Sequence, residues 1–247
     1  MKITSVNNEI IKETSKLLTS KYRDEKGLFI LEGIKGIEEA FNANLEILKI
    51  FVEENSSEQI YPLLQNKDII YEVSEAVMKK ISDAKTPSKA IAVVKKPNVK
   101  WSDDYKNIIL LDGIKDPGNL GTIIRTASAF SVDAIILYGD TVDLFNPKCV
   151  RATVGNLWKI PVFKFENLKH LKEYEFIATL PNGENVINIK DYKPARKTIV
   201  MFGSEAQGLS EELKQIADKS ITISMKKTVE SLNLSVSAGI IMNQLFN

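Results

Sequence analysis

The fold of this 247-residue chain is set by one stretch, Ile108-Ile109-Leu110-Leu111-Asp112-Gly113-Ile114-Lys115-Asp116-Pro117-Gly118-Asn119-Leu120-Gly121. It begins with an apolar block typical of a strand buried on both faces, as in a parallel sheet covered by helices. The Gly- and Asn-rich part that follows is typical of a loop between strand and helix, where open α/β sheets bind ligands. Its glycine spacing, G-x4-G-x2-G, is not the dinucleotide-binding fingerprint, and no Lys-Ser/Thr pair of a phosphate loop follows. The stretch therefore predicts a ligand site in a parallel α/β sheet and argues against nucleotide-dependent oxidoreductases and P-loop enzymes.

The same alternation continues to the end of the chain. Short apolar blocks predict strands at residues 108–111, 134–137, 176–179, 199–202 and 221–225. Helical patterns lie at residues 120–130, 147–154, 211–217 and 234–246. Strands that alternate with helices predict an α/β fold with a parallel sheet.

A polar, Pro-containing segment at residues 97–105 predicts a linker between two domains, at residues 1–96 and 106–247. In the first domain we expect a helix within the first twenty residues and others at 36–42, 60–65 and 75–81. Strands are expected at 28–31, 47–52, 69–73 and 90–94. These patterns predict a small α/β domain without a cofactor motif.

Composition excludes several classes of protein. With 33 Lys and Arg against 32 Asp and Glu, the formal charge is +1, so RNA binding would depend on local basic groups. A single cysteine, Cys149, and a single histidine, His170, argue against disulfides and against a zinc site, so we expect no metal. No apolar run approaches the roughly 18 residues of a membrane span, and the N-terminus lacks the apolar block of a signal peptide. We therefore expect a cytoplasmic protein without a membrane partner.

Polar side chains in loops that follow the strands are candidates for chemistry. Arg125 lies four residues after Gly121, so it shares a helix face with the Gly-rich loop and can point back toward it. Glu205 and Asn233 belong to two later loops. Each of the three also has a structural explanation: an ion-paired or snorkelling arginine, a solvated loop acid, and a helix cap.

Together, these segments resemble the motifs of the SpoU/TrmH family of RNA ribose 2′-O-methyltransferases. Residues 112–130 contain N-x-G-x-x-x-R-T-A, residues 201–210 contain G-x-E-x-x-G-L-S, and residues 221–243 contain I-x-M…E-S-L-N-x-S-V. Residues 146–153 resemble the family's intermediate segment. Residues 27–40 resemble its substrate-binding domain, which is similar to an RNA-binding ribosomal-protein fold.

The resemblance implies a C-terminal parallel-sheet α/β domain with a deep trefoil knot (the SPOUT fold). It implies S-adenosylmethionine as methyl donor and a ribose 2′-hydroxyl of structured RNA as acceptor. The N-terminal domain favours ribosomal RNA; the alternatives are a tRNA 2′-O-methyltransferase and a non-catalytic RNA-binding protein that keeps the fold. A homodimer through the knotted domain is also implied. An apolar stripe on the last helix contributes to it, unless that stripe faces the core: Val236, Ile240, Ile241 and Leu245.

The resemblance also assigns roles to residues. The cofactor is expected to contact Thr179, Leu180, Gly203, Ile223, Met225 and Leu232. Arg125 is expected to act on the hydroxyl, positioned with the ribose by Asn119, Glu205 and Asn233. Because arginine normally keeps its proton, Arg125 either accepts the proton in a strongly perturbed site or binds a phosphate and orients the hydroxyl. The candidate RNA contacts, which could also be ordinary solvated residues, are Lys21, Arg23, Lys26 and Lys89.

Overall fold

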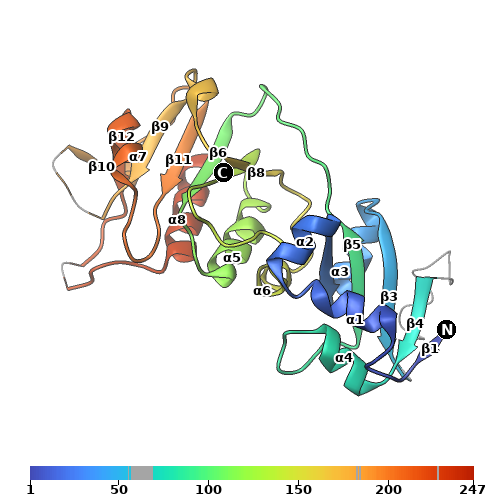
Figure 1. Ribbon diagram of the computed structural model, residues 1–247. Helices are drawn as coiled ribbons and strands as arrows, with labels where there is room; N and C mark the ends of the chain where they lie inside the picture. The colour runs from blue at the N-terminus through green and yellow to red at the C-terminus, as the bar shows by residue number, and fades with distance from the viewer. Residues whose placement is uncertain (55, 57–68, 182, 184, 227) are drawn as a thin grey trace. The chain divides into compact units, whose positions relative to one another are not determined.

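The computed structural model describes residues 1–54, 56, 69–181, 183, 185–226 and 228–247 (Figure 1). The helix expected at residues 60–65 lies outside the described residues. The chain divides into two compact units. The first consists of Met1–Asn98 and Asp143–Trp158, and the second of Val99–Val142 and Lys159–Asn247. The division after Asn98 falls inside the expected linker, whereas residues 143–158 belong to the first unit although the sequence pattern assigns them to the second domain.

The first unit is built on a mixed five-stranded sheet of order β1-β4-β3-β5-β2. Its strands are β1 (Lys2–Ile3), β2 (Leu28–Glu32), β3 (Ile47–Glu53), β4 (Ile70–Val73) and β5 (Ala90–Lys95). Its helices are α1 (Glu9–Lys16), α2 (Ser20–Lys26), α3 (Ile34–Asn42), α4 (Glu75–Ile81) and α6 (Pro147–Ala152). β5 is antiparallel to both β2 and β3, and the remaining pairs are parallel. The small α/β domain predicted from the sequence is thus present.

Two of the elements that the structure describes in this unit escaped the sequence prediction. β1 has only two residues, too few to show a period. α2 has the sequence SKYRDEK, whose mostly charged residues form no apolar stripe. One side chain of α2, that of Arg23, is nevertheless buried, so the tertiary contacts of this helix decide its place.

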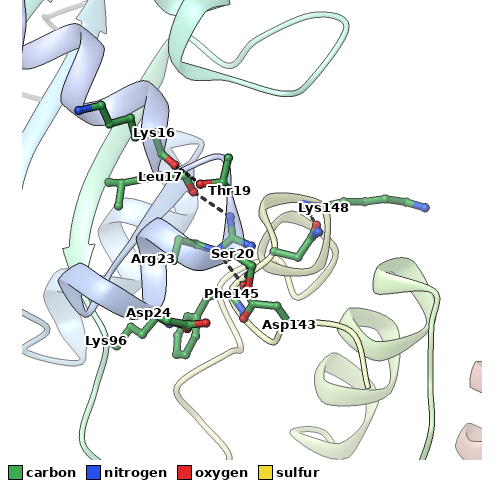
Figure 2. Close-up of polar contacts among 11 residues, drawn as sticks. Lys16, Leu17, Thr19, Ser20, Arg23, Asp24, Lys96, Asp143, Phe145 and Lys148 are labelled. Carbon is green, nitrogen blue, oxygen red and sulfur yellow. Dashed lines mark hydrogen bonds and ion pairs between the residues drawn. The ribbon is translucent and has the colours of Figure 1, made fainter. Parts of the chain in front are cut away.

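Arg23 is 2% exposed, and Figure 2 shows its side chain directed at Asp143. Its Nε and Nη2 donate to Asp143 Oδ2 at 2.8 and 2.5 Å, and its Nη1 donates to the Leu17 carbonyl at 2.8 Å. A buried guanidinium is stable only when it is paired in this way. The expectation that Arg23 contacts RNA is therefore wrong: its charge is used inside the first unit.

Residues 143–158 join the first unit through further contacts. The Phe145 ring lies 4.9 Å from the Phe29 ring, and Arg151 Nη1 donates to the buried Glu32 carboxylate at 2.8 Å and to Asp83 at 2.5 Å. Contacts of α6 with β2 accompany these polar bonds. This short helix therefore completes the first unit from a distant part of the sequence.

The second unit contains a seven-stranded sheet of order β10-β12-β9-β11-β6-β7-β8, parallel throughout. Its strands are β6 (Asn107–Asp112), β7 (Ala134–Tyr138), β8 (Val162–Phe165), β9 (Glu175–Thr179), β10 (Val186–Asn188), β11 (Thr198–Phe202) and β12 (Lys219–Thr222). Its helices are α5 (Pro117–Ala127), α7 (Glu211–Ile216) and α8 (Leu234–Phe246), with short 3₁₀ helices at Lys169–Leu171 and Ile189–Asp191. The parallel α/β prediction is confirmed. The two strands it missed, β8 and β10, are short edge strands.

The apolar blocks of the sequence form the centre of this sheet. Every residue of β11 is buried, as are all residues of β6 after Asn107. α5 and α8 pack against each other beside these strands (Figure 1). Because the strands are parallel, the loops that follow β6, β9, β11 and β12 leave from the same edge of the sheet. β12 ends at Thr222, so residues 223–225, expected to continue the strand, belong to one of these loops.

No helix in the described part of the chain has both the length and the apolar character needed to span a bilayer.

Candidate active site

α5 places Asn119 beside the Gly-rich loop. Asp116 caps the helix, its Oδ1 accepting a hydrogen bond from the Asn119 backbone N–H at 2.8 Å, and Pro117 occupies the first turn, where a missing N–H costs nothing. Asn119 therefore lies in the first turn of α5, next to the carboxyl end of β6. This local arrangement follows directly from the Asp-Pro-Gly-Asn sequence.

Three of the four expected catalytic residues form one hydrogen-bonded chain. Asn233 caps α8, its Oδ1 accepting from the Ser235 N–H at 2.9 Å, the Ser235 hydroxyl at 2.7 Å and the Val236 N–H at 3.3 Å. Asn233 Nδ2 donates to Asn119 Oδ1 at 3.0 Å, and Asn119 Nδ2 donates to Glu205 Oε1. Because the helix start offers only donors and the carboxylate accepts, the orientation of both amides is determined. The structure thus brings together Asn119 from the first turn of α5, Glu205 from the loop of residues 203–210, and Asn233 from the start of α8.

The loop of residues 203–210, which carries Glu205, is closed on itself. Ser204 and Gly208 exchange two backbone hydrogen bonds, of 3.1 and 2.9 Å, and Gly208 has a φ of +68°. A Cβ at Gly203 would lie 1.9 Å from the Gly208 carbonyl carbon and 2.0 Å from the Leu209 nitrogen, closer than real Cβ atoms come. Only glycine at position 203 permits this conformation.

The far end of the same loop is attached to β6 by Asp112. The buried Asp112 carboxylate accepts from the Ser210 N–H at 2.8 Å. Beside it, the Tyr138 hydroxyl donates to Glu212 at 2.9 Å, and burial, together with this hydrogen bond, raises the pKa of Tyr138. Sequence reasoning missed Asp112 as an anchor; the signal was an acid that ends an apolar strand.

Arg125 does not join this chain of hydrogen bonds. It lies on α5 six residues after Asn119, which is about 9 Å along the helix axis, and its side chain is exposed. Its guanidinium makes no hydrogen bond or ion pair with any residue that the structure describes. The role of Arg125 stays a prediction.

A cavity of about 700 Å³ opens beside Glu205 and Asn233, at the ends of β9, β11 and β12 and the start of α8. All six expected cofactor contacts line it: Thr179, Leu180, Gly203, Ile223, Met225 and Leu232. Among its described lining residues Glu205 is the one acid and Lys214 the one base, and Lys214 pairs with Glu211 at 2.7 Å. Apolar walls with backbone polar groups suit an uncharged heterocycle, and a carboxylate at the rim suits a cation.

The remaining candidate RNA contacts lie in the first unit and are exposed. Lys21 and Lys26 belong to α2, where Lys26 pairs with Glu25 and lies 5.4 Å from the Tyr22 ring centre. Lys89 precedes β5 and lies 3.9 Å from Glu53. Unlike Arg23, these three side chains are accessible to a polyanion.

The described residues contain no group of three or more His, Cys, Asp or Glu side chains that could hold a metal ion.

Comparison with known proteins agrees with the motifs. Residues 106–243 match the SpoU rRNA Methylase family, and residues 8–92 match the MRM3-like substrate binding domain. The chain is 30% identical, over 98% of both chains, to the 23S rRNA (guanosine(2553)-2′-O)-methyltransferase RlmP of Bacillus subtilis.

Solved structures give the same result. An AdoMet-bound rRNA methyltransferase from Sinorhizobium meliloti superposes with a TM-score of 0.87 at 27% identity, covering 99% of this chain and 96% of that one. An RNA 2′-O ribose methyltransferase superposes with a TM-score of 0.84 at 29% identity, covering 99% and 97%. The family match spans more than half of the chain, and RlmP is similar to it over nearly the full length of both proteins. The chain therefore belongs to the SpoU rRNA methylase family.

Proposed function

We propose that this protein methylates the 2′-hydroxyl of a ribose in ribosomal RNA, with S-adenosylmethionine as the methyl donor. Family membership makes it an RNA methyltransferase. One observation supports the assignment to this site. The hydrogen-bonded side chains of Glu205, Asn119 and Asn233 lie at the rim of a cavity that all six expected cofactor residues line.

The cavity fits the proposed cofactor. Leu180, Ile223 and Leu232 offer apolar walls to an adenine, while Gly203 allows the loop of residues 203–210, which lines the cavity, to close on itself. Glu205 supplies a negative charge next to a molecule that carries a sulfonium. When bound, S-adenosylmethionine supplies an electrophilic methyl carbon, and the protein's residues hold the acceptor sugar and its proton.

The choice of ribosomal RNA is supported by two findings. The first domain matches a substrate-binding domain, and both RlmP and the Sinorhizobium neighbour are named as rRNA enzymes. Lys21, Lys26 and Lys89 are the proposed contacts to its phosphates. A tRNA substrate is the alternative. The non-catalytic alternative is disfavoured because the complete Glu205–Asn119–Asn233 chain serves no purpose in a protein that only binds RNA.

We also propose the trefoil knot and the homodimer for the second unit. The knot is supported by the end-to-end likeness to solved family structures. The dimer is supported by the apolar stripe of α8, which is only partly buried. Ile241 is buried, whereas Val236 and Ile240 are 50% and 40% exposed. These two exposed side chains, one turn apart, are available to a second copy of the chain, and light scattering of the purified protein measures its mass.

Methyl transfer from labelled S-adenosylmethionine tests the function. With RNA from cells that lack this gene, we expect label in ribosomal RNA and a single 2′-O-methyl position on mapping. Label confined to transfer RNA establishes the alternative substrate. Absence of label from every RNA, together with no calorimetric binding of S-adenosylmethionine, contradicts the assignment and favours the RNA-binding protein.

Arg125→Ala tests the expected catalytic arginine. We expect methyl transfer to fall by about 10²-fold or more while the affinity for S-adenosylmethionine stays within about twofold, since Arg125 does not line the cavity. Turnover near that of the wild type would remove Arg125 from the mechanism.

A further inference from the structure

The proposed reaction releases a proton from the ribose hydroxyl, and the site must provide an acceptor. General-base assistance of this kind contributes roughly 10²- to 10⁴-fold to rate. Arginine side chains in proteins stay protonated, so a guanidinium donates hydrogen bonds and does not accept them. Asparagine amides do not take up a proton at physiological pH either. The proton therefore has to pass to a group other than Arg125, Asn119 or Asn233.

Few of the described titratable side chains at the cavity can accept the hydroxyl proton. Lys214 forms an ion pair with Glu211, 2.7 Å away. Asp112 and Asp116, the acids nearest in sequence to Asn119, bind backbone N–H groups of Ser210 and Asn119 and do not line the cavity. Among the described lining residues, Glu205 alone is an acceptor that can be protonated and released.

The hydrogen-bonded chain holds this carboxylate by one oxygen and leaves the other free. Asn119 Nδ2 binds Oε1, and the orientation of Asn119 is fixed in turn by Asn233 and the start of α8. Oε2 has no partner among the described residues, and the side chain is exposed. A carboxylate that is held in one orientation at the cavity rim, with one oxygen that makes no hydrogen bond to the described residues, is positioned to act as a general base.

We propose that Glu205 is the catalytic base and accepts the 2′-hydroxyl proton at Oε2. This rests on the proposed function. As the O2′–CH₃ bond forms and the S–CH₃ bond of the sulfonium donor breaks, the hydroxyl proton passes to Oε2. Water then removes it from the exposed carboxyl group, which restores the carboxylate. Arg125 serves to bind an RNA phosphate.

Two substitutions separate this role from one of positioning. Glu205→Gln keeps an oxygen that can accept from Asn119 but cannot take the proton, whereas Glu205→Ala removes both functions. We expect single-turnover methylation to fall about 10²- to 10⁴-fold in both variants. Glu166→Ala, an exposed acid after β8, is the matched control and should keep wild-type activity. Near-normal turnover in Glu205→Gln means that positioning suffices, and it overturns the proposal.

Chemical rescue provides the second test. Formate is a small carboxylate that fits the space left by the side chain in Glu205→Ala. Added formate should therefore raise the methylation rate of Glu205→Ala at least tenfold and leave the rate of Arg125→Ala unchanged. Rescue absent from Glu205→Ala overturns the proposal. A wild-type protein that methylates no RNA overturns the proposed function instead, so the two failures are distinguishable.

Binding measurements provide a readout independent of turnover. The product S-adenosylhomocysteine carries no sulfonium, so its affinity does not depend on the charge of Glu205, and Glu205→Gln should bind it within about twofold of wild type by calorimetry. Retained binding of the product also shows that the variant is folded. A loss of affinity for the product would show that Glu205 supports the shape of the cavity, and it would contradict the role of base.

Discussion

At the scale of single residues, the cavity depends on the missing side chain of Gly203. This glycine follows β11 directly, and its Cα faces the backbone of Gly208 and Leu209. The contact closes the loop of residues 203–210, and Glu205 lies two residues further along. A methyl group at position 203 would therefore displace the loop that carries the proposed base as well as a wall of the cavity.

Gly203→Ala should weaken binding of S-adenosylmethionine by about tenfold or more and lower the free energy of unfolding by about 1–3 kcal/mol, as overpacking does. Calorimetry and urea denaturation measure the two effects. Gly239→Ala on α8 is the control: its Cβ would lie 3.5 Å from Thr126, an ordinary contact, and alanine favours a helix. Equal behaviour of the two variants would show that the close approach at Gly203 has no consequence.

At the scale of elements, α2 exists because of its tertiary contacts. Seven residues are far too few for an isolated helix in water. The helix ends at Gly27, whose φ is +64°, and its Arg23 is bound to Asp143, 120 residues away in the chain. One buried ion pair thus connects α2 to the segment that leads into α6.

Arg23→Ala should lower the free energy of unfolding by about 3–5 kcal/mol, because it leaves the Asp143 carboxylate without its partner. Lys95→Ala is the control, since its ion pair with Glu46 is more than half exposed and should contribute about 1 kcal/mol or less. The salt dependence of RNA binding should not change in Arg23→Ala. A shallower slope would instead show a lost phosphate contact and restore Arg23 to the RNA-binding residues.

At the scale of the whole molecule, stability should depend on alkaline pH through a buried tyrosine. The Tyr174 hydroxyl donates to the Tyr105 carbonyl at 2.8 Å, and burial raises the pKa of Tyr174 to about 12. In the unfolded chain a tyrosine ionises near pH 10. The protonated hydroxyl therefore stabilises the fold fully below pH 10, and this contribution is lost as pH rises from 10 to 12.

Tyr174→Phe should make the fall of unfolding free energy between pH 10 and 12 shallower, by about 2 kcal/mol over that range. Urea denaturation at a series of pH values measures the slope. Tyr192, also buried, has a raised pKa and contributes in the same direction, so part of the slope should persist. Parallel curves for the two proteins would contradict the assignment to Tyr174.

Much of the fold could be predicted because its signals are local. Apolar blocks marked the five central strands of the second unit, and the Asp-Pro-Gly-Asn sequence marked the start of α5. β8 and β10 were missed because strands of four and three residues are too short to show a clear period. The site residues were expected from the resemblance of three motifs to those of a known family, whereas Asp112 was missed because its role depends on Ser210, 98 residues away.

The sequence by itself determined the parallel α/β class and the family, since hydrophobic period and motif spacing are properties of neighbouring residues. Only the tertiary structure decided that Arg23 is buried, that residues 143–158 complete the first unit, and that Asn119 lies between Glu205 and Asn233. These outcomes depend on bonds between residues 86 to 120 positions apart. A local pattern shows which charges and amides are available, and the packing of the whole chain selects their partners.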